Sequence, residues 1–241
     1  MKIVSFGGGV QSTAMAVLAA HGKIEVDAFV FCDTGFEQSC VFEFLEAHTI
    51  PMLNIAGIPF YIAKAEDYAG KYFADLDLPP FFNNDNNEVG RSPAFCSSKW
   101  KREVFTRFCN VKFGEKQYDV LMGFSTDERQ RAIRMKSTKK WQYKFPLLDL
   151  NMNRGECIGM VEKQFNVEPP RSSCYYCPNH TRAEWRKVME SSDREKLIEF
   201  DNKLRSIGKF LTHDCLPIAE CDFDDMNESI FSRLCAGGCF L

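Results

Sequence analysis

The stretch SFGGGVQST, Ser5 to Thr13, lies between a strand-like segment, KIVSF at residues 2–6, and a run typical of a helix, AMAVLAAHG. Each glycine costs about 0.5–1 kcal/mol relative to alanine in regular structure, so three consecutive glycines need a steric or conformational reason. Backbone amides at a helix N-terminus bind anions, and glycines let a phosphate approach them closely. The stretch therefore predicts a phosphate-binding loop behind the first strand.

The rest of the N-terminal half repeats this strand–helix order. Further strand-like segments occur at residues 27–32, 59–63 and 119–124. They alternate with helical segments at residues 12–21, 36–48 and 98–108. Alternation of this kind predicts an α/β fold with a Rossmann-like parallel sheet, helices on both of its faces, and ligands at the carboxyl ends of the strands.

Composition sets limits on the class of protein. The chain has 241 residues, 45% of them hydrophobic, and a net charge of −3, so bulk charge predicts no nucleic-acid partner. It starts with a strand-like segment rather than a signal sequence, and we expect a cytoplasmic protein without membrane association. Eleven cysteines without a secretory signal indicate reduced thiols, metal ligands or catalysis rather than a disulfide framework.

Two regions are expected along the chain. Residues 1–151 form the nucleotide-binding α/β domain, and residues 152–241 form a C-terminal helical appendage that carries cysteines. In the appendage, one helix is expected from Thr181 and a second from a capping box at Ser192–Glu195. Residues 75–93, rich in Pro, Asn and Asp, predict a long surface loop that could act as a lid.

The glycine loop does not fit two common phosphate-binding motifs. It has neither the lysine of a Walker P-loop nor the glycine spacing of the Rossmann fingerprint. It resembles instead the S-G-G-x-D-S loop of the PP-loop N-type ATP pyrophosphatases. Nucleotide-binding residues are then expected at Ser5, Gly7, Gly8, Gly9, Gln11, Ser12 and Thr13.

This loop departs from the PP-loop pattern at two positions. Gly7 replaces the first serine of the motif, and Gln11 replaces its aspartate. A neutral amide is a poorer partner for hydrated Mg²⁺ than a carboxylate, which puts magnesium-assisted pyrophosphate cleavage in doubt.

Three further segments strengthen the resemblance. DTGFE at 33–37, GFSTDERQRA at 123–132 and FPLLDLN at 145–151 resemble, in the same order, segments of the phosphoadenylyl-sulfate (PAPS) reductase-like family. The resemblance extends to a branch near the DNA phosphorothioation and tRNA thiolation enzymes. It implies ATP, or the sulfonucleotides PAPS or APS, as the bound nucleotide, together with Mg²⁺. The implied nucleotide-binding residues are Asp33, Thr34, Glu37, Gly123, Arg131 and Arg134, with Asp127 and Arg131 catalytic.

The cysteines predict a metal centre. CYYCP at 174–178 contains a C-x-x-C motif, and Cys96 lies among lysines in FCSSKWKREVF. By resemblance to iron–sulfur members of the superfamily, Cys96, Cys174 and Cys177 hold a [4Fe–4S] cluster, and Cys96 is also catalytic. For the fourth position we take Cys239, with Cys235, His180 or no protein ligand as alternatives. Thiolates at this spacing also suit Zn²⁺.

Four other cysteines have no expected chemical role. Cys32, Cys40, Cys109 and Cys157 lie in apolar surroundings and are expected to be small core residues.

These features predict an enzyme that carries out ATP-dependent, adenylating sulfur transfer to a nucleic-acid or nucleotide acceptor. A sulfur donor protein is expected to supply the sulfur. The alternatives are a sulfonucleotide reductase that uses Cys235 or Cys239, and a non-catalytic nucleotide-binding or sensing protein. Residues 129–144 carry seven Lys or Arg and no acid, which is either a solvated face or a contact surface for tRNA or DNA. An oligomer is compatible with the sequence.

Overall fold

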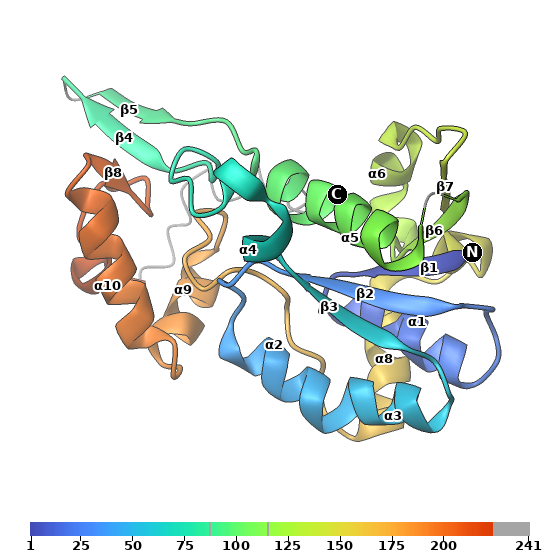
Figure 1. The fold of residues 1–241 in the computed structure, drawn as a ribbon. Coiled ribbons are helices and arrows are strands. Elements are labelled where there is room, and N and C mark those ends of the chain that lie inside the picture. Colours follow the sequence, from blue (N-terminus) through green and yellow to red (C-terminus); the bar gives the residue numbers. More distant parts are fainter. Residues whose placement is uncertain (87, 115, 224–241) are drawn as a thin grey trace.

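A computed structural model describes residues 1–86, 88–114 and 116–223, and it is built on a five-stranded parallel sheet of order β3-β2-β1-β6-β7 (Figure 1). The strands are β1 (Lys2–Phe6), β2 (Ala28–Asp33), β3 (Phe60–Lys64), β6 (Tyr118–Met122) and β7 (Trp141–Lys144). In the register, Ser5 pairs with Val30 on one side and Met122 on the other. Short apolar runs suit strands that are covered on both faces. The predicted α/β class is confirmed.

Helices cover both faces of the sheet. One face carries α1 (Val10–Ala20), α7 (Pro146–Asp149), α8 (Arg154–Phe165) and a helix formed by α2 (Ser39–Phe44), a π-helical turn (Leu45–Thr49) and α3 (Ile50–Ile55). The other face carries α4 (Ala65–Tyr68) and a helix formed by a π-helical turn, η3 (Ser97–Arg102), and α5 (Glu103–Phe113). Successive residues of β1 point to opposite faces of the sheet, so Ile3 packs in the hydrophobic core on one face and Val4 in the core on the other.

Helix α8 begins just after the expected domain boundary at residue 151. It packs on α1, and Cys157 and Val161 are fully buried there. It therefore belongs to the layer of helices that covers one face of the sheet.

The region beyond α8 combines helices with a small second sheet. It contains α9 (Arg182–Met189), α10 (Arg194–Arg205), β8 (Lys209–Phe210) and a short 3₁₀ turn (Ile218–Glu220). Strand β8 pairs antiparallel with β4 (Phe82–Asp85), which pairs antiparallel with β5 (Glu88–Arg91). The prediction of a surface loop over 75–93 is therefore wrong for the part that forms this hairpin. Phe82 is buried and stacks edge-on against His213, so a contact from distant sequence outweighs the loop-like composition.

The two C-terminal helices differ in how well their starts were predicted. Helix α9 begins after Thr181, whose side chain caps it as expected. Helix α10 begins at Arg194, and the predicted capping box at Ser192–Glu195 is wrong. The intervening Asp193 carboxylate instead accepts hydrogen bonds from the Ser39 backbone N–H (2.8 Å) and hydroxyl (2.6 Å), at the start of α2.

Replacing Asp193 by alanine is expected to lower the free energy of unfolding by about 1–3 kcal/mol, because two partly buried donors of Ser39 lose the buried carboxylate that accepts from them. Urea denaturation measures the effect. Glu190→Ala, three residues earlier and exposed, is the matched control and should stay within about 0.5 kcal/mol of the wild type. An unchanged Asp193→Ala would mean that this contact does not fasten α10 to α2.

Among the described residues, no helix is both long enough and apolar enough to span a bilayer.

Candidate functional site

A cavity of about 480 Å³ lies at the carboxyl ends of β1, β2 and β6, where a parallel sheet of this kind places its ligands. Its volume is typical of small-molecule sites. Among the described residues, the predicted site residues that line it are Ser5, Gly7, Gly9, Gln11, Ser12, Thr34, Cys96, Gly123, Asp127, Arg131, Cys174 and Cys177.

The glycine loop has the conformation that its sequence requires. Gly8 has φ +77°, and a Cβ there would lie 2.8 Å from Cγ1 of Val41 and 3.2 Å from the Phe31 ring. A Cβ on Gly123, behind β6, would lie 3.2 Å from the Ser12 nitrogen. Glycines at these two positions allow α1 to begin against the sheet edge, where the cavity lies.

Helix α1 presents its N-terminus to the cavity. Gly9 is the N-cap, and the first intrahelical hydrogen bond runs from the Thr13 N–H to the Gly9 carbonyl (3.0 Å). The amides of Val10, Gln11 and Ser12 therefore have no acceptor one turn earlier in the helix. All three residues line the cavity, and their amides can receive a phosphate. The hydroxyls of Ser12 and Thr13 both donate to the Gly9 carbonyl, so they shape the loop.

Gln11 is held between two charged side chains. Its Nε2 donates to Oε2 of Glu128 (3.1 Å), and its Oε1 accepts from Nη1 of Arg154 (3.1 Å). Asp127 accepts a hydrogen bond from the Arg154 backbone N–H (2.6 Å), and this contact lowers the pKa of the Asp127 carboxyl. Asp127 and Glu128 both line the cavity. Carboxylates thus stand next to the amide that replaces the aspartate of the PP-loop pattern.

The two arginines of the expected clamp have different positions on α6 (Arg129–Arg134). Arg131 lines the cavity, forms an ion pair with Glu128, and lies over the Phe124 ring at 4.3 Å. Arg134 is exposed and is not brought to the cavity. The geometry leaves Arg131 as the member of the pair that can contact a bound anion.

Cys96, Cys174 and Cys177, the three predicted ligands, line this cavity together with the glycine loop and Cys32. Cys174 forms an isolated antiparallel bridge with Glu37, and its Sγ lies 3.6 Å from Oγ1 of Thr34. Burial raises the pKa of Tyr176 well above its usual value, and the neighbouring thiols of Cys174, Cys96 and Cys177 raise it further. Segments far apart in sequence therefore bring their thiols close to one buried tyrosine.

A single metal ion and an iron–sulfur cluster place different demands on the spacing of these thiols. Among the described residues, no three His, Cys, Asp or Glu side chains lie close enough together to hold a single ion. A tetrahedral zinc site needs sulfurs about 3.8 Å apart, as follows from the usual zinc–sulfur distance. A cubane cluster binds each thiolate through a different iron and therefore needs sulfurs that surround a larger volume. The predicted ligands Cys235 and Cys239 lie outside the described residues.

The buried cysteines outside the predicted ligand set are poor nucleophiles. Burial raises the pKa of Cys32 and Cys109 to about 12 and that of Cys157 to about 11. Their assignment to the core is confirmed, whereas that of Cys40 is wrong, because Cys40 is exposed. Cys40 is the second residue of α2, on the side facing solvent.

Iodoacetamide at pH 8 should accordingly label Cys40 and spare Cys32, although Cys32 lines the cavity. With a pKa near 12, roughly one Cys32 in 10⁴ is a thiolate at this pH. Peptide mass spectrometry of the folded protein measures both sites. Equal labelling of Cys32 and Cys40 would contradict the burial of Cys32, and urea-unfolded protein supplies the fully labelled reference.

Several site residues differ from the sequence-based expectation. Gly8, Thr13, Asp33 and Glu37 do not line the cavity among the described residues. Residues that sequence reasoning missed do line it: Trp100, Lys101, Glu128, Arg154, Arg171, Ser172, Ser173 and Asn179. The segment RSSC at 171–174 contributes Ser172, whose Cβ would lie 3.5 Å from a Cβ placed on Gly9. No sequence motif pointed to this contact.

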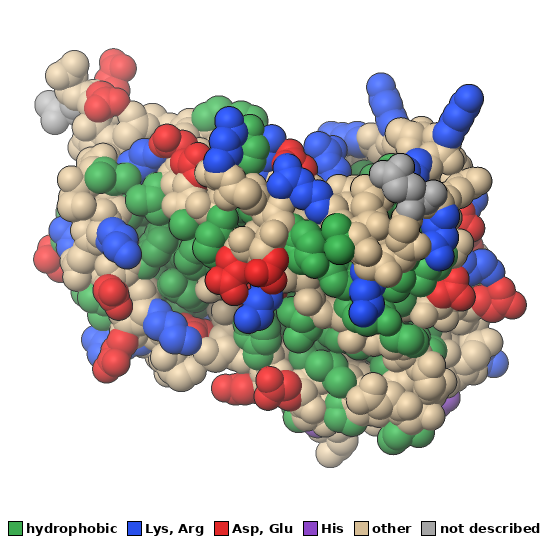
Figure 2. Space-filling model, viewed as in Figure 1, with side chains coloured by type: hydrophobic (Ala, Val, Ile, Leu, Met, Phe, Trp, Pro, Cys, Tyr) green, Lys and Arg blue, Asp and Glu red, His purple; other side chains and the backbone are tan. Residues whose placement is uncertain are grey.

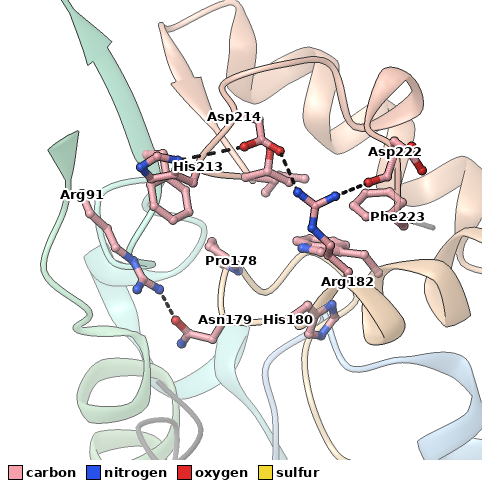
Figure 3. Close-up of a pocket in the computed structure, with 13 residues that line it drawn as sticks. Arg91, Pro178, Asn179, His180, Arg182, His213, Asp214, Asp222 and Phe223 are labelled. Carbon is pink, nitrogen blue, oxygen red and sulfur yellow. Dashed lines mark hydrogen bonds and ion pairs between the residues drawn. The ribbon is translucent and has the colours of Figure 1, made fainter. Parts of the chain in front are cut away.

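A second, smaller pocket of about 60 Å³ lies between the β4–β5 hairpin and α9 (Figure 3). Asn179 and His180 belong to the walls of both pockets. Arg182 contacts Asp214 and the Asp222 carbonyl, and Arg91 contacts Asn179. The Arg91 contact fastens the loop after Cys177 to the hairpin, and the Arg182 contacts fasten α9 to the segment after β8.

No family model matches the sequence, and no curated protein matches it. Among solved structures, the chain is similar to the U34-tRNA thiolase NcsA from Methanococcus maripaludis with its [4Fe-4S] cluster. Identity is 14% and the TM-score is 0.49, over 86% of this chain and 65% of the thiolase chain. This chain therefore covers less than two thirds of the thiolase, and the likeness does not by itself assign an activity.

Proposed function

We propose that the protein catalyses ATP-dependent, adenylating sulfur transfer to a nucleic-acid or nucleotide acceptor. The observation that carries this proposal is the shared cavity: a glycine loop with helix amides, Arg131, and the thiols of Cys96, Cys174 and Cys177 line one space. A phosphate-binding loop explains nucleotide binding alone, whereas thiols in the same space bring sulfur chemistry to the nucleotide.

In the proposed first step, the α1 amides hold the β- and γ-phosphates of ATP. An acceptor oxygen attacks the α-phosphorus, the bond to the β-phosphate oxygen breaks, and pyrophosphate leaves. Arg131 neutralises negative charge that develops on the phosphates, held in position by Glu128 and the Phe124 ring. Sulfur at the oxidation level of sulfide then attacks the activated carbon, and AMP leaves with the oxygen.

Carboxylates for the magnesium that accompanies ATP are available despite Gln11. Asp127 and Glu128 line the cavity within the network that holds Gln11. Mg²⁺ binds through one or two carboxylates together with substrate phosphates, which fits this donor set. We assign this role to Glu128 and Asp127, with Gln11 orienting Glu128.

The thiols of Cys96, Cys174 and Cys177 are the proposed ligands of a [4Fe–4S] cluster. When bound, a cluster with three protein ligands supplies an iron that can carry sulfur. The protein's own contribution is a wall of aromatic rings behind the thiols, where Tyr176 stacks on Phe200 at 4.0 Å between ring centroids. That wall limits access of water from the side of α10.

Residues 129–144 are the proposed surface for an acceptor nucleic acid. They form α6, the following loop and β7, where Lys and Arg side chains project at the upper right of Figure 2. The exposed side chains are those of Arg129, Arg134, Lys136, Lys139 and Lys144. Since Arg131 on the same helix lines the cavity, phosphate contacts on this face would bring an acceptor to the site.

Arg131→Ala should weaken the binding of ATP by about 1.5–3 kcal/mol, roughly 10- to 150-fold, because a charge-assisted contact to phosphate is lost. Arg134→Ala, on the same helix but exposed outside the cavity, is the matched control and should bind ATP like the wild type. Isothermal titration calorimetry measures both. Equal effects of the two substitutions would remove Arg131 from the nucleotide site.

The experiment that tests the proposed function begins with anaerobic purification and determination of iron and acid-labile sulfide. The loaded protein is then incubated with ATP, Mg²⁺, sulfide and unmodified tRNA or DNA, and pyrophosphate release is measured. Bound iron with acceptor-dependent pyrophosphate supports sulfur transfer. Sulfite release from adenylyl sulfate or its 3′-phosphorylated form would identify a reductase instead, and ATP binding without pyrophosphate release would identify a sensor.

A further inference from the structure

We infer that the buried ion pair between Glu37 and Lys101 positions the cysteine-bearing segments, so that Glu37 acts on the thiols and not on the nucleotide. The inference rests on the proposed function for its consequence, namely cluster assembly. Its geometry is independent of any bound group.

The Glu37 carboxylate is buried and joins two distant segments. Its side chain is 0% exposed, and Oε1 accepts from Nζ of Lys101 at 2.8 Å. Its second oxygen, Oε2, accepts from the Ser172 hydroxyl at 3.3 Å. A buried carboxylate is costly unless it is paired and hydrogen-bonded, so each partner is held firmly where it is.

Each contact of Glu37 leads to one of the cysteines. Lys101 lies in η3, the turn of helix that follows Cys96. Ser172 precedes Cys174 by two residues, and Cys174 forms its backbone bridge with Glu37 itself. One carboxylate therefore connects the segments of both Cys96 and Cys174.

The backbone around Glu37 completes this connection. The Tyr175 N–H donates to the Phe36 carbonyl (2.9 Å), and the Gln38 N–H donates to the Ser173 carbonyl (3.2 Å). Lys101 lines the cavity, whereas Glu37 lies behind it. Loss of the carboxylate would remove the acceptor that Lys101 and Ser172 share, and η3 would shift away from residues 172–174.

The test compares Glu37→Gln, Lys101→Met and the double variant in the full chain. Alkylation of Cys96 and Cys174 by iodoacetamide is measured on reduced, metal-free protein, with exposed Cys40 as the internal reference. Iron content is measured after reconstitution. Glu37→Gln should raise labelling of Cys96 and Cys174 relative to Cys40 by at least about fivefold and lower bound iron by more than half. The double variant, in which both partners of the ion pair are neutral, should recover part of both.

The matched control is Asp201→Asn. Asp201 is a buried carboxylate that accepts from Arg205 at 2.9 Å on α10, away from the cavity. The Asp201→Asn variant should lower the stability of the protein without changing the labelling of Cys96 and Cys174 relative to Cys40. Wild-type labelling ratios in Glu37→Gln, or ratios that Asp201→Asn changes equally, would overturn the inference. If wild-type protein binds no iron, the proposed function fails, and the labelling ratios still decide the role of Glu37.

Discussion

Gly8→Val is expected to abolish ATP binding and to destabilise the protein by about 2–6 kcal/mol. Gly8 has φ +77°, a conformation that a β-branched residue adopts only under strain. A Cβ would also lie 2.8 Å from Val41 and 3.2 Å from Phe31. Both neighbours are buried, so the loop would have to move. The N-terminal amides of α1 would then no longer point toward the phosphates.

The matched control for this variant is Gly22→Val. Gly22 has φ +67°, but a Cβ there meets nothing within 4 Å. This variant carries the backbone strain without the collision, and it should bind ATP normally with a smaller loss of stability. Urea denaturation and calorimetric titration with ATP measure both. Normal ATP binding by Gly8→Val would show that the phosphate-binding conformation differs from the one described.

Cys174→Ser is expected to reduce bound iron and sulfide to less than about a tenth of the wild-type content and to remove sulfur transfer with it. A serine hydroxyl is a poor ligand for iron at neutral pH, and Cys174 is the thiol fixed by the bridge to Glu37. The visible absorption of anaerobically purified protein and iron analysis give the readout. ATP binding should remain, because the amides of α1 are unchanged.

Cys40→Ser is the control for this second prediction, since Cys40 is exposed and outside the cavity. Full iron content in Cys174→Ser would exclude the residue as a ligand. Iron lost equally from both variants would indicate adventitious binding to thiols.

The sequence predicted the part of the fold that depends on local patterns. Strands β1, β2, β3 and β6 are apolar runs bounded by turn residues, and helix α9 has a capping box at its start. Strand β7 was missed because Trp141 and Tyr143 alternate with polar residues for only four positions inside a basic stretch. The β4–β5 hairpin was missed because its pairing with β8 joins segments more than a hundred residues apart.

The candidate site divides in the same way. Residue type and spacing predicted the glycine loop, and the family resemblance pointed to Cys96, Cys174 and Cys177, which line the same cavity. The roles of Glu37 and Gln11 could not be predicted, because Lys101, Ser172, Glu128 and Arg154 reach them only through the tertiary fold. A motif position indicates that a side chain matters; it does not indicate which neighbour the side chain contacts.

The bridge between Glu37 and Cys174 joins residues that the ribosome releases far apart in time. The carboxylate leaves the exit tunnel early, and its partner strand residue follows 137 positions later. The parallel sheet can form once β7 has emerged. The cavity wall that carries Cys174 and Cys177 can form only after residues 172–177 have emerged. Non-local contacts of this kind form late and slowly. We therefore expect the proposed metal site to form only after residues 172–177 have been synthesised, later than the glycine loop and the parallel sheet.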